Sequence, residues 1–433
     1  MTASLATADD CDDTQPSSIG KVLLLTGCPP GRGHVGEIIL RDLVLHVGLR
    51  HFVSVAIVSR GYPLQVDTRV SELDSTLIEM DELFIRRRSK GFFGSVESML
   101  RFLLRFLPRR DTLFKQLKKE ASGISSVFAV LNNGMIFGLA HRLADALKVP
   151  LVCLVWDPPA YLLQQARYDR LTRQVLLRDF RKSLQRASRV AVVSRAMECE
   201  YAKLTTATFT ILRHVAISSP SAETFLPLAP EESAEWVIGF AGSMYAEDAW
   251  LALLRALDDA DWVIAGRAIR LRLLTPIITV VSWRPANIDF LGYRDATDVQ
   301  SVLRTCDMAF LPQPFSPYLR ELCEMAFPTK LSEYLSAGLP VLVLAPEYSA
   351  LHEFLAEHPV GTACASLDSV DIRNVLRAYI GNRDAHERTR MVANSVAREH
   401  FGRAQFTRNV EVLLGCRVDE FRPNRAQKEE PRL

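Results

Sequence analysis

The sequence has few of the features that mark a metalloprotein or a disulfide-bonded protein. Its eight cysteines are scattered along 433 residues without a C-x-x-C pair, which excludes a zinc ribbon and favours reduced thiols in the cytosol. The nine histidines show no ligand spacing; His352 and His358 enclose two glutamates but are spaced more widely than the zinc motif H-E-x-x-H requires. We therefore expect no metal and no resident cofactor.

A long hydrophobic run and a strong net charge are also missing. No stretch reaches the roughly 18 apolar residues that a membrane-spanning helix needs. The formal net charge of +2 excludes a chain-wide polyanion-binding surface, so we expect no nucleic-acid partner. Residues 1–20 are polar and acidic, without the basic start and apolar core of a signal peptide. We expect them to be a disordered lead-in to a cytoplasmic protein.

Short apolar runs alternate along the chain with longer segments of helical period. This pattern is typical of an α/β protein with parallel sheets. Two series of such units are separated by residues 218–235, a stretch that holds three prolines and reads as a linker. We expect a first domain, a second domain, a final helix and a polar tail over residues 21–217, 236–390, 391–414 and 415–433. The apolar runs expected to be strands are residues 21–26, 52–59, 127–131, 149–156, 190–194 and 208–212, then 237–240, 262–265, 288–291, 308–311 and 341–344.

A glycine-rich loop follows the first apolar run. Gly31, Gly33 and Gly36 form the literal G-x-G-x-x-G of dinucleotide-binding folds. However, two prolines separate the loop from its strand, and the second strand ends at Arg60, which would suit NADP, instead of at an acidic residue. Three interpretations stay open: the phosphate site of an NADP-dependent oxidoreductase, a flexible loop that lines a ligand cleft, and a plain tight turn.

Residues 84–119 alternate basic with aromatic and aliphatic side chains. A basic amphipathic segment of this kind can lie on an anionic membrane surface. It can equally be a core helix with a solvated basic face, and nucleic acid is a weaker third option because no recognised module surrounds it. The segment leaves open a peripheral position at the inner face of the membrane.

Small or charged residues stand where successive apolar runs end. In the first half Asp157 follows the run at residues 149–156, at a strand's carboxyl end, where ligands and catalytic groups usually lie. In the second half such residues follow four runs and recur before the fifth, and they belong to one edge of one sheet, which is a layout typical of a nucleotide site. They are Gly242, Arg267, Gly292, Pro312, and Lys330 with Glu333.

The segment around Lys330 predicts a loop, a short helix and a buried strand. Pro328 suits a helix start, and Gly338 suits a left-handed helix end. Lys330 and Glu333 then lie in the first turn, where a phosphate is favoured, and Glu333 can accept hydrogen bonds from two ribose hydroxyls. In the alternative interpretation Glu333 only complements the helix dipole and Lys330 is solvated.

Five stretches of the second half carry a family resemblance: residues 238–243, 262–267, 288–292, 306–312 and 328–341. Together, and in this order, residues 235–414 resemble the GT-B glycosyltransferases, most closely glycosyltransferase family 4. The resemblance implies two Rossmann-like domains that face a cleft, with a C-terminal helix crossing back to the first domain. It also implies transfer of a sugar, without a metal and with retention of configuration, from a nucleoside-diphosphate sugar to an acceptor hydroxyl. The acceptor would be a carbohydrate or a lipid-linked molecule in glycan, glycolipid or cell-surface polysaccharide biosynthesis.

The same resemblance implies roles for individual residues. Glu333 would bind the donor ribose, Gly292 and Tyr293 would flank the base, and Asp157 or His34 would assist the acceptor hydroxyl. The full donor-binding set implied is Gly31, Gly33, Gly242, Ser243, Arg267, Gly292, Tyr293, Pro312, Lys330, Leu331 and Glu333.

Two other functions stay open beside the transferase. One is the NADP-dependent oxidoreductase of the first glycine loop. The other is a non-catalytic sugar-nucleotide-binding protein or an epimerase of the same fold. It is kept because Met325 stands eight residues before Glu333, where the family has a second glutamate.

Overall fold

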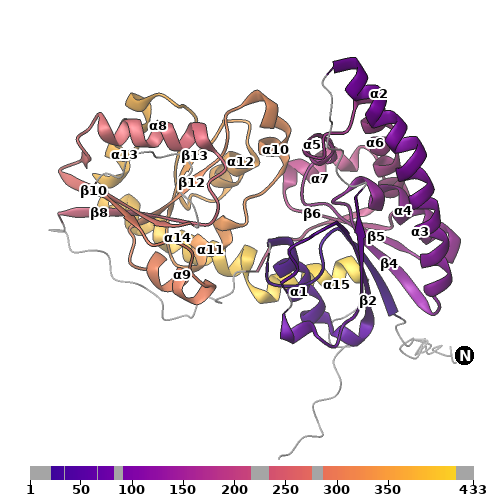
Figure 1. Ribbon diagram of the computed structural model, residues 1–433. Coiled ribbons are helices and arrows are strands. Elements are labelled where there is room, and N and C mark those ends of the chain that lie inside the picture. Colours follow the sequence, from indigo (N-terminus) through magenta and orange to yellow (C-terminus); the bar gives the residue numbers. More distant parts are fainter. Residues whose placement is uncertain are drawn as a thin grey trace, which may run out of the picture.

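The computed structural model describes residues 21–33, 35–65, 67–81, 91–215, 234–275 and 286–415. Within these ranges the chain forms two α/β domains that lie side by side, each built around its own parallel sheet (Figure 1). The predicted α/β class with two Rossmann-like domains is confirmed. The expected lead-in at residues 1–20, most of the linker at 218–235 and nearly all of the tail at 415–433 lie outside the described residues.

The sheet of the first domain has seven parallel strands in the order β3-β2-β1-β4-β5-β6-β7. Its central strands are buried on both faces, as continuous apolar runs predict. The edge strand β3 was not expected from the sequence, because its side chains are mostly polar and exposed. The strands are β1 (Lys21–Thr26), β2 (Phe52–Ser59), β3 (Asp74–Met80), β4 (Ile124–Val130), β5 (Leu151–Leu154), β6 (Arg189–Val192) and β7 (Thr208–Ile211).

Helices cover both faces of this sheet, with one hydrophobic cluster on each side. A π-helical turn, η3 (Phe102–Phe106), joins α2 to α3. The remaining elements are α1 (Val35–Val47), η1 (Leu49–His51), η2 (Thr68–Val70), α2 (Gly91–Arg101), α3 (Leu107–Glu120), α4 (Gly134–Leu147), α5 (Pro159–Gln165), α6 (Arg170–Arg186) and α7 (Arg195–Ala202).

The second sheet has the order β11-β10-β8-β12-β13-β14, all parallel, and a short strand β9 pairs with β10 in the antiparallel direction. The strands are β8 (Glu235–Ala241), β9 (Val263–Ile264), β10 (Arg267–Leu274), β11 (Ile288–Phe290), β12 (Met308–Pro312), β13 (Val341–Leu344) and β14 (Gly361–Cys364). The helices are α8 (Glu247–Asp258), α9 (Ala296–Leu303), η4 (Pro317–Leu319), α10 (Arg320–Met325), α11 (Lys330–Ser336), α12 (Ala350–Glu357), α13 (Ser369–Ile380), α14 (Arg383–Phe401) and α15 (Arg403–Leu414).

Of the strand expected at residues 262–265 only Val263–Ile264 form one, the short β9, and it is antiparallel to β10, so the position expected for Arg267 is wrong. Trp262 and Ala265 have positive φ angles of 58° and 52°, so the chain turns back on itself as a tight hairpin. Arg267 pairs with Ile264 and begins β10 beside the start of β8. It therefore lies at the amino edge of the sheet, opposite the edge where parallel strands present ligand sites.

The crossing of the C-terminal chain back to the first domain is confirmed, but the crossing helix is shorter than expected. Gly402 separates α14, which packs on α11 and α13, from α15, which packs on β6 and β7. On the first domain Asn409 donates to the Ile211 carbonyl at 2.8 Å, and Thr407 contacts His46 at 2.9 Å. The change of domain thus occurs at Gly402 and not at residue 391.

None of the helices within the described ranges is long and apolar enough to cross a bilayer.

Candidate functional site

Two adjoining cavities lie between the domains, at the carboxyl edges of both sheets. Cavity A has a volume of about 310 Å³. The first domain lines it with Trp156, Asp157 and Arg213, the last of which lies in the segment after β7, and the second domain lines it with Gln313 and Cys323. Cavity B, about 440 Å³, lies over the second domain and is lined by residues that include Gly242, Ser243, Tyr293 and Glu333. The linings share Val35, His214, Tyr245, Thr329 and Lys330, so the two cavities form one cleft.

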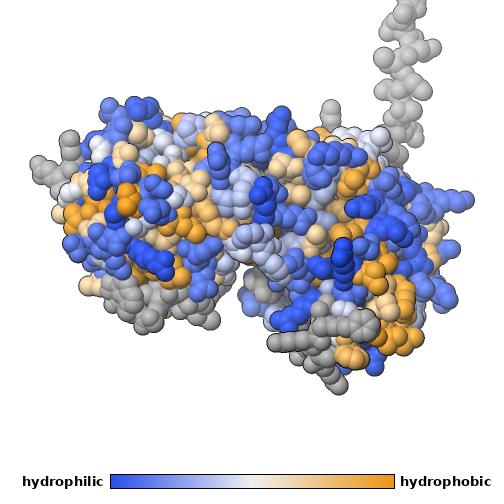
Figure 2. Space-filling view, turned by 90° about the horizontal axis from the view of Figure 1, so that it is seen from above, coloured by the Kyte–Doolittle hydropathy of each residue, from blue (hydrophilic) through white to orange (hydrophobic). Residues whose placement is uncertain are grey.

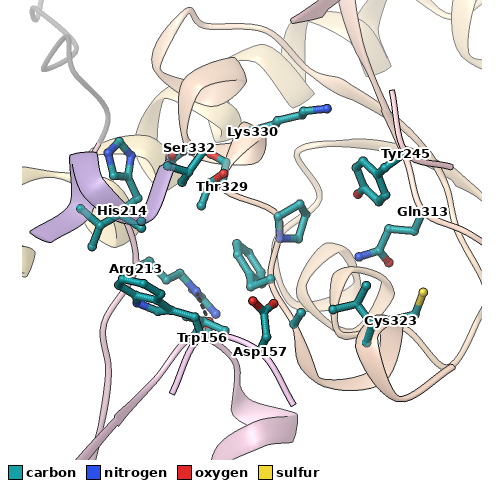
Figure 3. Close-up of a pocket in the computed structure, with 18 of the residues that line it drawn as sticks. Trp156, Asp157, Arg213, His214, Tyr245, Gln313, Cys323, Thr329, Lys330 and Ser332 are labelled. Carbon is teal, nitrogen blue, oxygen red and sulfur yellow. Dashed lines mark hydrogen bonds between the residues drawn. The ribbon is translucent and has the colours of Figure 1, made fainter. Parts of the chain in front are cut away.

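Lys330 lines both cavities, and Figure 3 shows it among the residues of cavity A. Its ammonium donates to the Ser243 carbonyl at 2.6 Å and lies 4.2 Å from the centre of the Phe240 ring and 5.2 Å from that of Tyr245. Burial lowers the pKa of Lys330 to about 7. At neutral pH the Lys330 amine is therefore protonated, and positively charged, in only part of the molecules.

Gly242 makes the close approach of Lys330 geometrically feasible. Its φ of 99° is a left-handed conformation that other residues rarely adopt. A Cβ atom at this position would lie 2.9 Å from Cε of Lys330. The structure therefore brings three of the predicted donor residues, Gly242, Ser243 and Lys330, into direct contact with one another.

Glu333 lies one helical turn beyond Lys330 and is held by hydrogen bonds. Gln300, buried on α9, donates one amide hydrogen to Glu333 Oε2 at 2.8 Å and contacts the Glu333 backbone carbonyl at 3.0 Å. The other carboxylate oxygen lies 3.9 Å from His214 Nδ1. Glu333 and the exposed ring of Tyr293, which follows Gly292 in its left-handed turn, line cavity B. The expected ribose and base positions therefore open onto the same cavity.

Asp157 extends from the end of β5 into cavity A, as predicted. In Figure 3 its carboxylate and the Gln313 amide point into the cavity from opposite domains. Burial raises the pKa of Asp157 to about 6. The other predicted catalytic residue, His34, lies outside the described residues, although its neighbour Val35 lines both cavities.

The chain segment that leaves the first domain supplies two residues that were not predicted. The Arg213 guanidinium lies over the rings of Phe327 and Phe354, at 4.1 and 5.0 Å, and its Nε donates to the Val193 carbonyl at 3.0 Å. Burial lowers the pKa of Arg213 to about 10. His214 lies between two carboxylates, each 3.9 Å away, and burial lowers its pKa as well. The rule that strand ends carry site residues would have found both, since they follow β7 directly.

Pro312 and Leu331 were expected at the donor but lie in the protein core. Pro312 ends β12 with its side chain buried, and Leu331 is fully buried on the inner face of α11. The next residue, Gln313, reaches cavity A instead, and its buried Oε1 has no hydrogen-bond partner among the described residues. The strand end was predicted correctly, but the contact residue was placed one position too early.

The glycine loop of the first domain is occupied by the protein's own carboxylate. Glu37, fully buried, accepts hydrogen bonds from the Gly33 amide at 2.8 Å and from the Tyr62 hydroxyl at 2.6 Å. Gly31 and Gly33 lie outside the linings of both cavities, so their expected approach to the donor is not seen. Arg267, with its guanidinium 5.6 Å from the Trp236 ring, is remote from the cleft for the reason given above.

The position of the missing second glutamate is apolar. Leu322, Cys323 and Ala326 of α10 and the following turn line cavity A, whereas Glu321 and Glu324 do not. Glu324 pairs instead with Arg320 at 2.7 Å. Across the described ranges, no group of three or more His, Cys, Asp or Glu side chains is placed to hold a metal ion.

Comparison with known proteins gives the fold its class. No family model matches the sequence, and no curated protein matches it. Solved structures match over almost the whole chain, and they place it in the GT-B fold of two facing Rossmann-like domains.

Three of these structures show the breadth of the match. HepE of Anabaena, in complex with UDP and glucose, aligns with a TM-score of 0.60 at 13% identity, over 92% of this chain and 99% of its own. The UDP-forming α,α-trehalose-phosphate synthase of Burkholderia vietnamiensis gives 0.58 at 10%, over 91% and 100%. The calicheamicin glycosyltransferase CalG4 gives 0.51 at 14%, over 91% and 98%. Identities this low show that the fold is shared.

Proposed function

We propose that this protein is a glycosyltransferase that moves a sugar from a nucleoside-diphosphate sugar to an acceptor hydroxyl. The observation that carries the proposal is the convergence of Lys330, the Gly242–Ser243 turn and Glu333 on one cavity at the carboxyl edge of the second sheet. This set offers a cation for a diphosphate and an oriented carboxylate for a ribose. The fold neighbour HepE was crystallised with UDP and glucose, which makes UDP the first nucleotide to test.

The chemistry proposed needs no metal. The bond between the sugar's anomeric carbon and the donor diphosphate breaks, and a bond from the acceptor oxygen to that carbon forms. Negative charge then grows on the diphosphate, and a preorganised cation such as Lys330 stabilises it without reorganisation. From the resemblance of residues 235–414 we further propose retention of configuration, with the acceptor proton passing to the departing diphosphate.

Asp157 is the proposed contact for the acceptor hydroxyl. It faces cavity A from the domain opposite Lys330. With a pKa of about 6, most of its carboxylate is ionised at neutral pH and can accept a hydrogen bond from the attacking hydroxyl. If the anomeric configuration of the product proves to be inverted, the same residue is placed to take the proton itself.

Two alternatives have less support. A dinucleotide at the first glycine loop would compete with Glu37 for the Gly33 amide, and Arg60, the residue suited to NADP, pairs with Asp81 at 3.2 Å. A non-catalytic binder would need no carboxylate such as Asp157 in cavity A, opposite the proposed donor site. We further propose a carbohydrate or lipid-linked acceptor, in glycan, glycolipid or surface-polysaccharide biosynthesis, and a cytoplasmic site of action at the inner face of the membrane.

A donor screen tests the proposal. UDP, GDP and NADP are compared for their ability to raise the melting temperature, since a ligand that binds the folded state stabilises it. Sugar nucleotides are then incubated with the protein, and products are detected by mass. We expect a nucleoside diphosphate to stabilise the protein and NADP to have no effect.

Replacing Glu333 is the matching variant test. We expect Glu333→Ala to weaken binding of the nucleoside diphosphate about tenfold or more. The variant loses the hydrogen bonds from the ribose to the carboxylate, and hydrogen bonds to a charged group contribute about 1.5–3 kcal/mol. Glu324→Ala, on the exposed side of α10, is the control and should bind like the unmodified protein. The proposal fails if no nucleoside diphosphate stabilises the protein and Glu333→Ala leaves product formation intact.

A further inference from the structure

The chain from α2 through η3 to the start of α3 is apolar on more than one side. Residues 99–107 are all hydrophobic except Arg101 and Arg105. A helix that is apolar all round is normally buried on all sides, in a protein core or in a membrane. Here the inner side of the segment packs on the domain, whereas its outer side is apolar and exposed. The exposed apolar side requires an explanation.

The inner side is an ordinary core contact. Phe102 and Phe106 are buried, stack on each other, and Phe106 meets Tyr168 edge to face at 6.2 Å. A buried hydrogen bond of 2.7 Å between Ser98 and Asp169 also fixes α2 to the start of α6. Core packing therefore accounts for Phe102 and Phe106, whereas Phe93, earlier on α2, is exposed.

The outer side is exposed. Leu100, Leu103 and Leu104 keep 47%, 47% and 71% of their surface accessible. At the adjoining start of α6, Leu171 and Val175 are 59% and 38% exposed. Figure 2 shows exposed hydrophobic side chains among strongly hydrophilic ones on this domain. Single exposed leucines are common, but three within five residues beside two more on a neighbouring helix form a patch.

The patch is framed by positive charge. The exposed cations on these helices are Arg105, Arg109, Lys115, Lys118, Lys119, Arg170, Arg178, Arg181 and Lys182. The acidic side chains of these helices are fewer, and three of the four are in ion pairs: Glu97 with Arg101 and Asp179 with Arg110, both at 2.6 Å, and Asp111 with Arg142 at 2.8 Å. The fourth, Glu120, is exposed at the far end of α3. In the sequence, Arg86, Arg87, Arg88 and Lys90 immediately precede α2.

We propose that this surface, the α2–α6 face, docks on an anionic lipid bilayer, with Leu100, Leu103, Leu104, Leu171 and Val175 entering the interface and the surrounding cations meeting lipid phosphates. Apolar side chains inside a basic frame match the two parts of such a surface, acyl chains and anionic headgroups. A protein partner would have to supply a large acidic surface with an apolar centre to match the same pattern.

The α2–α6 face lies on the same domain as Asp157, the proposed contact for the acceptor hydroxyl. Tyr168, against which η3 packs, follows α5, and α5 begins directly after Asp157 and Pro158. In Figure 1, α2 and α5 lie at the same end of the domain. Helix α5 thus connects the Asp157 side of cavity A with the elements that carry the α2–α6 face. The lipid-linked acceptor rests on the proposed function, whereas the docking surface itself does not.

Vesicle flotation tests the proposal with the full-length protein and no substrate. We expect binding to phosphatidylcholine vesicles that contain phosphatidylglycerol, weakening as salt is added, and little binding to phosphatidylcholine alone. Leu103→Ser with Leu104→Ser should weaken binding about tenfold or more, because two apolar side chains are then lost from the acyl-chain region. Arg105→Glu with Arg109→Glu should weaken it on the order of fivefold per charge removed.

Matched controls lie on α14 and α15, outside the α2–α6 face. Met391 and Val412 are 52% and 49% exposed, and their replacement by serine should leave vesicle binding unchanged. The exposed Arg388 and Arg398 of α14 provide the charge-matched pair, each changed to Glu. All variants are checked for an unchanged melting temperature.

Three outcomes would overturn the proposal. They are absence of binding to anionic vesicles, equal binding by Leu103→Ser with Leu104→Ser, and a dimer in solution that this double variant dissociates while vesicle binding persists. The last would assign the face to a second copy of the chain. UDP stabilisation is measured on the same samples. Loss of that signal alone would count against the donor site and leave the docking surface standing.

Discussion

The two domains each have a glycine-containing turn after their first strand, and only the turn of the second domain opens onto the cleft. In the first domain the Gly33 amide is already bonded to the buried carboxylate of Glu37. In the second, the Gly242–Ser243 turn faces cavity B and holds the Lys330 ammonium against it. The first turn has the better sequence motif, yet the second has the free volume and the cation. A glycine motif therefore indicates a ligand site only where the protein leaves its polar groups unused.

Replacing the cation beside each turn, Lys330 in the second domain and Arg32 in the first, gives the largest expected difference in kcat/KM. We expect Lys330→Met to lower kcat/KM about 10²–10³-fold with whichever sugar nucleotide proves to be the donor, because the group that opposes charge on the diphosphate is lost. Arg32→Met, an exposed cation of the first turn, should stay near the unmodified rate. Equal losses in the two variants would reverse the assignment.

The pH dependence of diphosphate affinity comes next. The protonated form of Lys330 attracts the anion, and its pKa of about 7 in the free protein means that raising the pH above 7 removes this charge. We expect UDP affinity to fall between pH 7 and 9, by up to about tenfold for each pH unit. Lys330→Arg, which stays charged throughout this range, should bind with little pH dependence. Calorimetric titration at several pH values measures both; a flat profile in the unmodified protein would contradict the role of Lys330.

Alanine at each glycine compares the turns directly. Gly242→Ala puts a side chain into a left-handed conformation, at a cost of about 1–2 kcal/mol, and presses on Lys330. We expect it to weaken UDP binding about tenfold. Gly33→Ala brings a methyl group 3.0 Å from Glu37 Oε2 and should lower the melting temperature with unchanged affinity. A loss of UDP affinity in Gly33→Ala would place the first turn in the site after all.

The smallest effect on binding is expected for Glu37→Gln. The amide can accept from the Gly33 N–H and donate to the Tyr62 hydroxyl oxygen, but both bonds then lose the assistance of the carboxylate charge. The free energy of unfolding should fall by about 1–2 kcal/mol, the difference between charged and neutral hydrogen bonds. Urea titration measures the loss, and UDP affinity should not change. Tighter binding in this variant would show that Glu37 competes with the donor.

The sequence predicted the layout of the second domain because strand-end positions follow from chain order alone. Residues 328–344 show how far this goes: Lys330 and Glu333 open the helix, Tyr334 is buried, and Gly338 has a φ of 75°, all as expected. These features depend on local periodicity and backbone preference, which a single sequence contains.

What could not be predicted depends on contacts distant in the sequence or on unusual turns. The hairpin at residues 261–266 uses non-glycine residues in left-handed conformations, which removed Arg267 from the cleft. Glu37 is recognisable as the partner of Gly33 only once α1 is packed. The strand-end rule points to Arg213 and His214, but their burial could not be predicted, because it arises where the chain passes between the two domains.

The C-terminal crossing has a consequence for how the protein is made. Phe406, Val410 and Leu413 of α15 complete the hydrophobic cluster on one face of the first sheet. During synthesis the first domain leaves the ribosome nearly 200 residues before this helix does. One face of its sheet therefore keeps an apolar surface uncovered until the second domain and α15 have been translated. The domain that is made first is thus the last to be completed, and a nascent chain stopped before α15 should be a preferred client for chaperones.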